Sequence, residues 1–198
     1  MAQPIPAPED VIALLDKTRR KQQTLFVGID GRGGSGKSTL ARALERADQR
    51  VTVVEFDDFY RPSSERKARS ARGDTEVGGN FDWRRVRDQV LLPLSRDEIG
   101  RYQRYDWLKD ELAEWHVVPT GGIAIIEGNF STRRELLSFY DFTIWIEAPH
   151  EVRLQHGLLR GGEDTRERWL TEWMPEEDRY IEAENPAGRV DLVLDGDG

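Results

Sequence analysis

The chain has 198 residues, of which 37% are hydrophobic and 33% charged, and its formal net charge is −8. This composition is typical of one folded domain and excludes a wholly disordered chain, while the acidic balance argues against nucleic acid as a partner. The chain contains no cysteine, which excludes disulfides and zinc–thiolate sites, and no apolar stretch approaches the roughly 18 residues of a membrane span.

Short apolar runs alternate with helical patterns along the chain. In chain order, we expect a helix over 8–20, a strand over 24–30, a helix over 37–46 and a strand over 51–56. Further helices over 83–94, 133–139, 150–160 and 176–184 are interleaved with strands over 123–127, 142–146 and 190–194. Because the strands are nearly all apolar, they predict an α/β fold with a five-stranded parallel sheet flanked by helices on both faces.

Two polar segments interrupt this alternation. Residues 61–80 contain glycine and lack periodicity, and residues 157–168 carry a glycine pair and three arginines. Long segments of this kind in compact domains tend to be functional or mobile. We therefore expect a single domain over 1–198, with an N-terminal helix within 1–22, an acceptor-side loop over 61–80 and a mobile lid over 157–168.

The most specific pattern is the run from Gly31 to Ser38, which matches G-x-x-x-x-G-K-[ST]. Its glycines allow backbone N–H groups to approach phosphate oxygens, and a helix starting near Lys37 adds its positive dipole end. The Lys37 ammonium is expected over the outer phosphates, and the Ser38 hydroxyl in the shell of a Mg²⁺ ion. The expected nucleotide-binding residues are Gly31, Gly33, Gly34, Ser35, Gly36, Lys37, Ser38 and Thr39.

The expected cofactors are therefore ATP and Mg²⁺. The chain has no Asn-Lys-x-Asp segment of the kind that reads guanine in GTPases, and no LSGGQ-like stretch of the kind found in transporter ATPases. These absences favour a kinase acting on a small molecule, although they leave the choice between ATP and GTP open. The first residues lack the basic start and apolar core of a signal peptide, so we expect a cytoplasmic protein with no membrane partner.

Four segments resemble elements of the uridine kinase/phosphoribulokinase family and occur in the family's order. They are Val27 to Thr39 (the phosphate loop), Phe56 to Arg61 (D-x-F-Y), Asn80 to Trp83 (F-D-H-P) and Glu127-Gly128 (F-E-G). The resemblance extends over about residues 25–196 and implies a three-layer P-loop NTPase fold. It also implies transfer of the γ-phosphate of ATP to a hydroxyl of a small molecule, with a nucleoside such as uridine or cytidine favoured.

The resemblance assigns roles to residues near the strand ends. Asp57 matches the family's catalytic base, and a carboxylate beside the phosphate loop suits proton acceptance from a hydroxyl. The adjacent Asp58 could exchange roles with it, and Glu127 matches the acidic residue that holds Mg²⁺ through water. Catalysis is expected to use Asp57, Lys37 and Arg160, and the acceptor is expected to contact Asp58, Tyr60, Asp82, Tyr105 and Arg166. Together with Arg168, the arginines Arg160 and Arg166 would close over the phosphates.

The acceptor half departs from the family pattern. Lys109 or Asp110 stands where uridine kinases present a histidine to the pyrimidine, and Trp107 occupies a neighbouring apolar position. The element F-D-H-P has become Phe81-Asp82-Trp83-Arg84. These changes keep two alternatives open: a kinase for another alcohol, such as a sugar phosphate or a pantothenate-like acid, and a nucleotide-binding regulatory NTPase. Because relatives form oligomers, a homo-oligomer is also expected.

Overall fold

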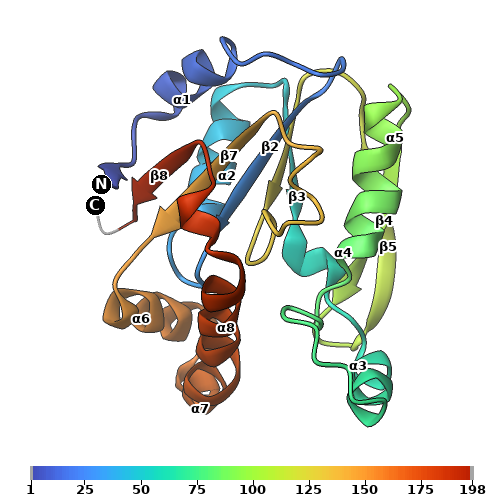
Figure 1. Cartoon of the computed structure of the whole chain (residues 1–198), viewed down its shortest axis with the longest axis vertical. Coiled ribbons are helices and arrows are strands. Elements are labelled where there is room, and N and C mark those ends of the chain that lie inside the picture. The colour runs from blue at the N-terminus through green and yellow to red at the C-terminus, as the bar shows by residue number, and fades with distance from the viewer. Residues whose placement is uncertain (1, 197–198) are drawn as a thin grey trace.

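The computed structural model describes residues 2–196, and a parallel sheet runs through its centre (Figure 1). Its strands are β1 (Gln3–Pro4), β2 (Leu25–Gly31), β3 (Val51–Glu55), β6 (Ile123–Glu127), β7 (Phe142–Glu147) and β8 (Leu192–Asp195). They lie in the order β1-β8-β7-β2-β6-β3, and every neighbouring pair is parallel. The five expected strands are present, but the expected count is corrected to six. The added strand, β1, is only two residues long and exposed, so no apolar run in the sequence predicts it.

Apolar side chains fill both faces of the sheet, which confirms the three-layer arrangement. Every residue of β2 and β6 is buried, because these central strands have protein on both sides. On one face, α1 (Pro8–Leu15) and α2 (Lys37–Ala47) contribute Val11, Leu15 and Leu40 to one core cluster. On the other face, Trp83, Val90 and Tyr180 belong to a second core cluster.

Two helical stretches of the chain continue beyond their regular α-helical segments through π-helical turns. α4 (Trp83–Val86) continues through a π-helical turn (Arg87–Leu91) into α5 (Leu92–Ser95). After α6 (His150–Gly161), a 3-10 turn (Glu163–Thr165) leads into α7 (Arg166–Arg168), which continues through a second π-helical turn (Trp169–Trp173) into α8 (Met174–Glu184). A further 3-10 turn (Pro186–Gly188) precedes β8. The segment 157–168, expected as a polar interruption, is therefore mostly helical.

The helix expected over 133–139 is wrong. This stretch is a succession of turns, with i→i+3 bonds such as Leu136 N to Arg133 O (2.9 Å) and Tyr140 N to Leu137 O (3.2 Å). The preceding residues are held by the buried Asp30 carboxylate, which accepts the N–H groups of Phe130 and Thr132. With these donors committed to a side chain, the backbone there is shaped by Asp30 and not by a helical ladder.

Two elements were not expected from the sequence. Within 61–80, the residues Ser63–Ala71 form the helix α3, none of whose residues is buried. After α5, the strands β4 (Gly100–Asp106) and β5 (Glu111–Val118) form an antiparallel hairpin outside the main sheet. The hairpin packs on the 3-10 turn Phe56–Phe59 that follows β3, where the rings of Tyr102 and Phe59 lie 4.8 Å apart.

The segments that follow the strands meet at one edge of the sheet. Glu127 at the end of β6 pairs in register with Ile29 of β2 and with Glu55 of β3. Beyond this edge, α6, α7 and α8 lie at the lower left and α3 at the lower right (Figure 1). Among residues 2–196, no helix has the length and hydropathy needed to cross a membrane.

Candidate active site

The phosphate loop connects β2 to α2 and is built for an anion. Gly34 and Gly36 have φ angles of +78° and +98°, in the region that favours glycine. Gly36 stands before α2 without a side-chain cap, so first-turn amides remain as donors for a ligand. A Cβ placed on Gly36 would meet no atom within 4 Å, and the buried Ser35 hydroxyl has no hydrogen-bond partner. This open cradle with an unpaired polar atom fits a chain of phosphates.

Two glycines of the loop also allow helices to pack against it. A Cβ on Gly33 would lie 2.8 Å from both a Glu177 oxygen and the Trp169 ring, and one on Gly34 would lie 2.4 Å from the Arg153 carbonyl oxygen. Glu177 lies on α8, Arg153 on α6 and Trp169 in the π-helical turn between α7 and α8. The helices around the expected lid therefore contact the phosphate loop directly. Their contacting residues carry no local sequence signal for this role.

Lys37 is buried at the start of α2 and points to the edge of the sheet. Its Nζ donates to the Arg32 carbonyl (2.8 Å) and to Asn129 Oδ1 (2.7 Å). Burial lowers the pKa of the ammonium, while the charges of nearby carboxylates, first Glu127 and then Glu177, raise it. The lysine is thus held by the protein in the place where its motif predicts a phosphate contact.

Glu127 and Ser38 lie together at the end of β6. The Ser38 side chain hydrogen-bonds to the Glu127 carboxylate, which is 4% exposed. Burial raises the pKa of Glu127 to about 7, while the charge of Lys37 lowers it. A hydroxyl beside a carboxylate is an oxygen donor set of the kind that Mg²⁺ takes together with substrate phosphates. Among the described residues, no cluster of three or more His, Cys, Asp or Glu side chains is placed to hold a metal alone.

Asp57 and Asp58 are adjacent in the turn after β3 but face different surroundings. The Asp57 carboxylate is exposed to solvent, although protein around it raises its pKa and the charges of Lys37 and Arg160 lower it. Asp58 accepts a hydrogen bond from the Tyr102 hydroxyl (3.0 Å), and burial raises the pKa of Asp58 to about 6. Asp57 is therefore electrostatically coupled to the phosphate loop and α6, whereas Asp58 is tied to the hairpin.

The expected acceptor residues are largely engaged with other side chains. Tyr60 is only 3% exposed and stacks on Trp107, with ring centroids 4.4 Å apart. The hydroxyl of Tyr105 donates to Asp110 (2.6 Å). Asp82 forms an ion pair with Arg61 (2.8 Å) and lines a cavity of about 410 Å³. The lining of this cavity is Arg61, Arg69, Asp82, Arg84, Arg85, Asp88 and Gln89.

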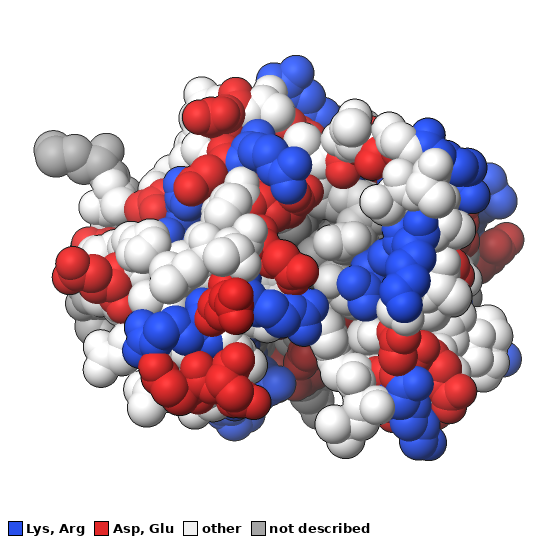
Figure 2. Space-filling view, turned by 90° about the horizontal axis from the view of Figure 1, so that it is seen from below, with Lys and Arg blue, Asp and Glu red and all other residues white. Residues whose placement is uncertain are grey.

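The arginines of 157–168 occupy different positions. Arg160 is exposed near the end of α6, and its charge acts on Asp57. Arg168 pairs with Glu172 (3.0 Å), and the charges of both act on the Tyr60 hydroxyl. Arg166 is exposed and forms an ion pair with Glu163. Viewed from below, acidic and basic side chains are mixed around the central hollow, with neither sign dominating (Figure 2). Selectivity for an anion must therefore come from local donors.

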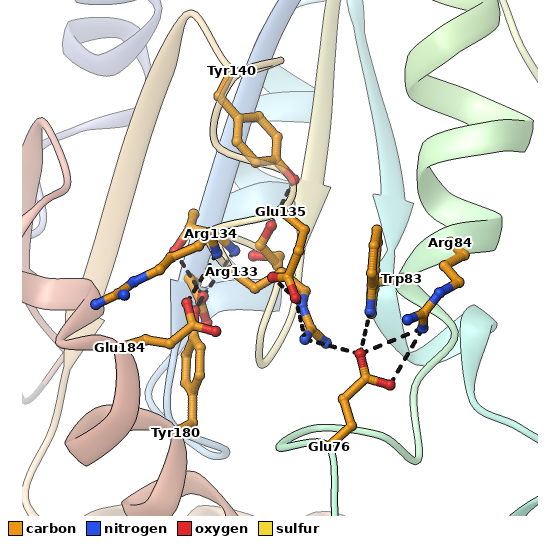
Figure 3. Close-up of polar contacts among 12 residues, drawn as sticks. Glu76, Trp83, Arg84, Arg133, Arg134, Glu135, Tyr140, Tyr180 and Glu184 are labelled. Atoms are coloured by element: carbon orange, nitrogen blue, oxygen red, sulfur yellow. Dashed lines mark hydrogen bonds and ion pairs between the residues drawn. The ribbon is translucent and has the colours of Figure 1, made fainter. Parts of the chain in front are cut away.

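Glu76 ties the acceptor-side loop to its surroundings (Figure 3). Its carboxylate accepts hydrogen bonds from Trp83 Nε1 (2.7 Å) and Arg69 (2.7 Å), and from Arg133 on the far side (3.3 Å). Although burial raises its pKa, these donors and Arg84 together lower the pKa of Glu76 to about 2. Sequence reasoning missed this residue because its donors are spread from position 69 to position 133.

We expect Glu76→Gln to lower the free energy of unfolding by about 2 kcal/mol at pH 7, a value discounted for partial exposure. The pKa of Glu76 is about 2 in the folded protein and 4.5 ordinarily. The stabilisation is therefore fully present above pH 4.5 and is lost as the pH falls towards 2. Urea denaturation across this range should show the variant approaching the parent at acid pH, with exposed Glu45→Gln on α2 unchanged throughout. A difference independent of pH would contradict the assignment.

Comparisons with known proteins agree with this geometry. No family model matches the chain. The uridine kinase of Alkaliphilus metalliredigens is 28% identical over 159 residues, which are 74% of this chain and 72% of that protein. The uridine kinase of Clostridium tetani is 27% identical over 156 residues, 74% of this chain and 71% of that protein.

The fold is also shared with a solved structure. A possible uridine kinase from Bacillus stearothermophilus has a TM-score of 0.71 at 23% identity, covering 96% of this chain and 97% of that one. The expectation of a kinase is therefore confirmed by the sequence similarity, together with the phosphate loop and the sheet with its flanking helices. This chain is similar in sequence to uridine kinases, and it is a P-loop kinase and therefore a phosphotransferase.

Proposed function

We propose that the protein transfers the γ-phosphate of Mg²⁺-bound ATP to a hydroxyl of a small molecule, with Asp57 as the base. The observation that carries the proposal is the strand register, which sets Glu127 of β6 beside Ile29 of β2, two residues before the phosphate loop, and beside Glu55 of β3, two residues before Asp57. In agreement, the charge of Lys37 acts on Asp57, and Ser38 hydrogen-bonds to Glu127. The residues to which we assign donor binding and proton acceptance therefore follow neighbouring strands at one edge of the sheet. A phosphotransferase needs both kinds of group within reach of one reacting phosphate.

On the donor side, each residue has a defined task. The amides of Gly34, Gly36 and Lys37 and the Ser35 hydroxyl would hold the phosphates, and the Lys37 ammonium would neutralise their charge. Ser38 and Glu127 would hold Mg²⁺, which supplies charge neutralisation between the outer phosphates when bound. Arg160 would add positive charge from α6 as negative charge spreads over the transferred group.

On the acceptor side, the proton of the attacking hydroxyl would pass to a carboxylate oxygen of Asp57. Asp57 suits this task because the residue is exposed and can contact a substrate. Protein around Asp57 raises its pKa, and a pKa closer to the working pH makes a better general base. Asp58 is less suited, since one of its oxygens already accepts the Tyr102 hydroxyl.

A nucleoside is the first candidate for the acceptor, because the curated relatives are named uridine kinases. A second candidate is a hydroxyl compound that carries an anionic group, such as a sugar phosphate or a hydroxy acid. It is favoured by the cavity beside Asp82. Three of the cavity's four arginines are paired with carboxylates, but the buried Nε of Arg85 has no hydrogen-bond partner. Arginine recognises phosphate and carboxylate through paired N–H donors.

The decisive experiment measures ADP release with Mg²⁺-ATP across nucleosides, sugars, sugar phosphates and hydroxy acids. Turnover that depends on one class supports the proposal and identifies the acceptor. Slow ATP hydrolysis that no added alcohol accelerates would contradict it and favour a nucleotide-binding regulatory NTPase.

We further propose a cytoplasmic location and a homo-oligomeric state, which fractionation of cells and light scattering on the purified protein would test.

For Arg160→Ala, we expect kcat to fall by about 100-fold with little change in ADP affinity, because its charge matters most in the transition state. Arg166→Ala is the matched comparison: it removes an arginine from the same segment, one paired with Glu163. Steady-state kinetics on an acceptor found above, with calorimetry for ADP, would measure both. Equal losses of kcat in the two variants would contradict the role given to Arg160.

A further inference from the structure

A chain of polar contacts connects Lys37 to the helices that flank the phosphate loop. Asn129, which follows Glu127 and Gly128 at the end of β6, accepts from Lys37 Nζ (2.7 Å) and donates through Nδ2 to Glu177 Oε1 (2.7 Å). The other Glu177 oxygen accepts from Arg153 Nη1 (3.0 Å). One amide side chain therefore lies between the lysine of the phosphate loop and a carboxylate of α8.

Glu177 is a rigid support for this amide. It is 3% exposed and Arg153 is 2% exposed, so the ion pair that joins α8 to α6 is buried. The same Glu177 oxygen that receives the Asn129 amide also accepts the backbone N–H of Gly33 (2.8 Å). With three donors on one buried carboxylate, Glu177 has little freedom to move.

The chemistry of asparagine fits its place between these two partners. An ammonium only donates and a carboxylate only accepts, so the side chain between them must accept on one side and donate on the other. The Asn129 amide does both in one orientation. The charges of several carboxylates, beginning with Glu127, also attract the Lys37 ammonium. The oriented acceptors that select one position for the ammonium are the Arg32 carbonyl and Asn129 Oδ1.

We propose that Asn129 is a positioning residue that holds the Lys37 ammonium in place for the outer phosphates of the nucleotide, with Glu177 as its anchor. The inference rests on the proposed function only in taking Lys37 as a phosphate contact. Its consequence is that the helices α6 and α8 influence phosphate binding through Glu177, although neither Arg153 nor Glu177 is needed as a phosphate ligand. Asn129 acts through Lys37, so its removal should matter only while Lys37 is present.

A double-mutant cycle tests this directly. The affinities of Mg²⁺-ADP and of adenosine are measured by calorimetry for the parent, Asn129→Ala, Lys37→Met and the double variant. We expect Asn129→Ala to weaken ADP binding by about tenfold, as for loss of one charge-assisted hydrogen bond, and to leave adenosine binding unchanged. In the Lys37→Met background, the same replacement should cause no further loss of ADP affinity.

Two outcomes would overturn the proposal. One is an equal loss of ADP affinity from Asn129→Ala with and without Lys37, and the other is an equal loss for adenosine and ADP. Thermal denaturation checks folding, and Asn129→Ser supplies the same cycle if the alanine variant does not fold. Gln155→Ala, an exposed amide on α6, is the control expected to leave both affinities unchanged. Because binding is measured without an acceptor, failure of this proposal is distinguishable from failure of the proposed function.

Discussion

Replacement of Asp57 by asparagine is expected to lower kcat by about 10²–10⁴, the usual contribution of a positioned general base. Asparagine keeps the size of the side chain but cannot accept the proton of the attacking hydroxyl. The affinity for ADP should change little, because no phosphate contact is removed. Single-turnover kinetics with the identified acceptor, together with calorimetry for ADP, would separate the chemical step from binding. Unchanged turnover would refute the assignment.

Asp58→Asn is the matched control for this experiment. The Asp58 carboxylate accepts the Tyr102 hydroxyl, so its replacement should loosen the contact with the hairpin and raise KM more than it lowers kcat. A loss confined to kcat in Asp58→Asn, with Asp57→Asn active, would exchange the two roles.

The pH profile adds a separate test of the base. Surrounding protein raises the pKa of Asp57 above the ordinary carboxyl value. Because the base must be deprotonated, activity should fall on the acid side of a pKa higher than that of an ordinary aspartate. At saturating Mg²⁺, which favours the ionised form of Glu127, this acid limb should be absent from the residual activity of Asp57→Asn.

The donor half of the site could be predicted because its parts are local in the sequence. The phosphate loop is one uninterrupted motif, and Asp57 and Glu127 lie at or just after buried apolar strands. Parallel strands bring their carboxyl ends to the same edge, so these residues had to converge once the sheet was recognised. The register places Glu127 beside Ile29 at the end of β2, and the loop that follows β2 returns Ser38 to the same carboxylate.

The missed elements lack such local signals. In the hairpin, Arg101, Gln103 and Arg104 interrupt the apolar pattern of β4, and Trp115 and Val117 of β5 are exposed. Its strands therefore do not read as buried runs. Likewise, nothing around Glu177 or Arg153 marks either residue as buried, because each is stabilised only by its partner on another helix. In the sequence, close helix packing is indicated only by the phosphate loop, because this loop has more glycines than phosphate binding requires.

The acceptor half could be predicted least, and the structure shows why. Positions that match the family are present, but Asp82 is paired with Arg61 and Tyr60 lies against Trp107. The sequence shows how many hydrogen bonds a side chain can form, but it does not show with which partners it forms them. Substrate class depends on the free donors and acceptors that remain, and only three-dimensional contacts define these.

Gly34→Ala is expected to destabilise the nucleotide-free protein by more than 3 kcal/mol, roughly twice the cost of a left-handed backbone alone. The new Cβ would lie 2.4 Å from the Arg153 carbonyl oxygen and 2.9 Å from its Cα. Both are backbone atoms of α6, so no side-chain rotation relieves the contact, and α6 must separate from the loop. That movement would strain the buried pair between Arg153 and Glu177. Nucleotide affinity should fall as well, because Glu177 supports Gly33.

Gly73→Ala separates the cost in stability of a left-handed backbone from the cost of the contact with α6. Gly73 has a φ angle of +72°, close to the +78° of Gly34, but a Cβ there would meet no atom within 4 Å. It should therefore show only the backbone cost, about 1–2 kcal/mol, with normal ADP binding. Urea denaturation of both variants gives the contribution of the helix contact by difference. If the two losses were equal, α6 would not be pressed against the phosphate loop in solution, and the helices would be free to move without disturbing it. A larger loss for Gly34→Ala would instead mean that the second half of the chain sets the shape of the phosphate loop before any nucleotide arrives.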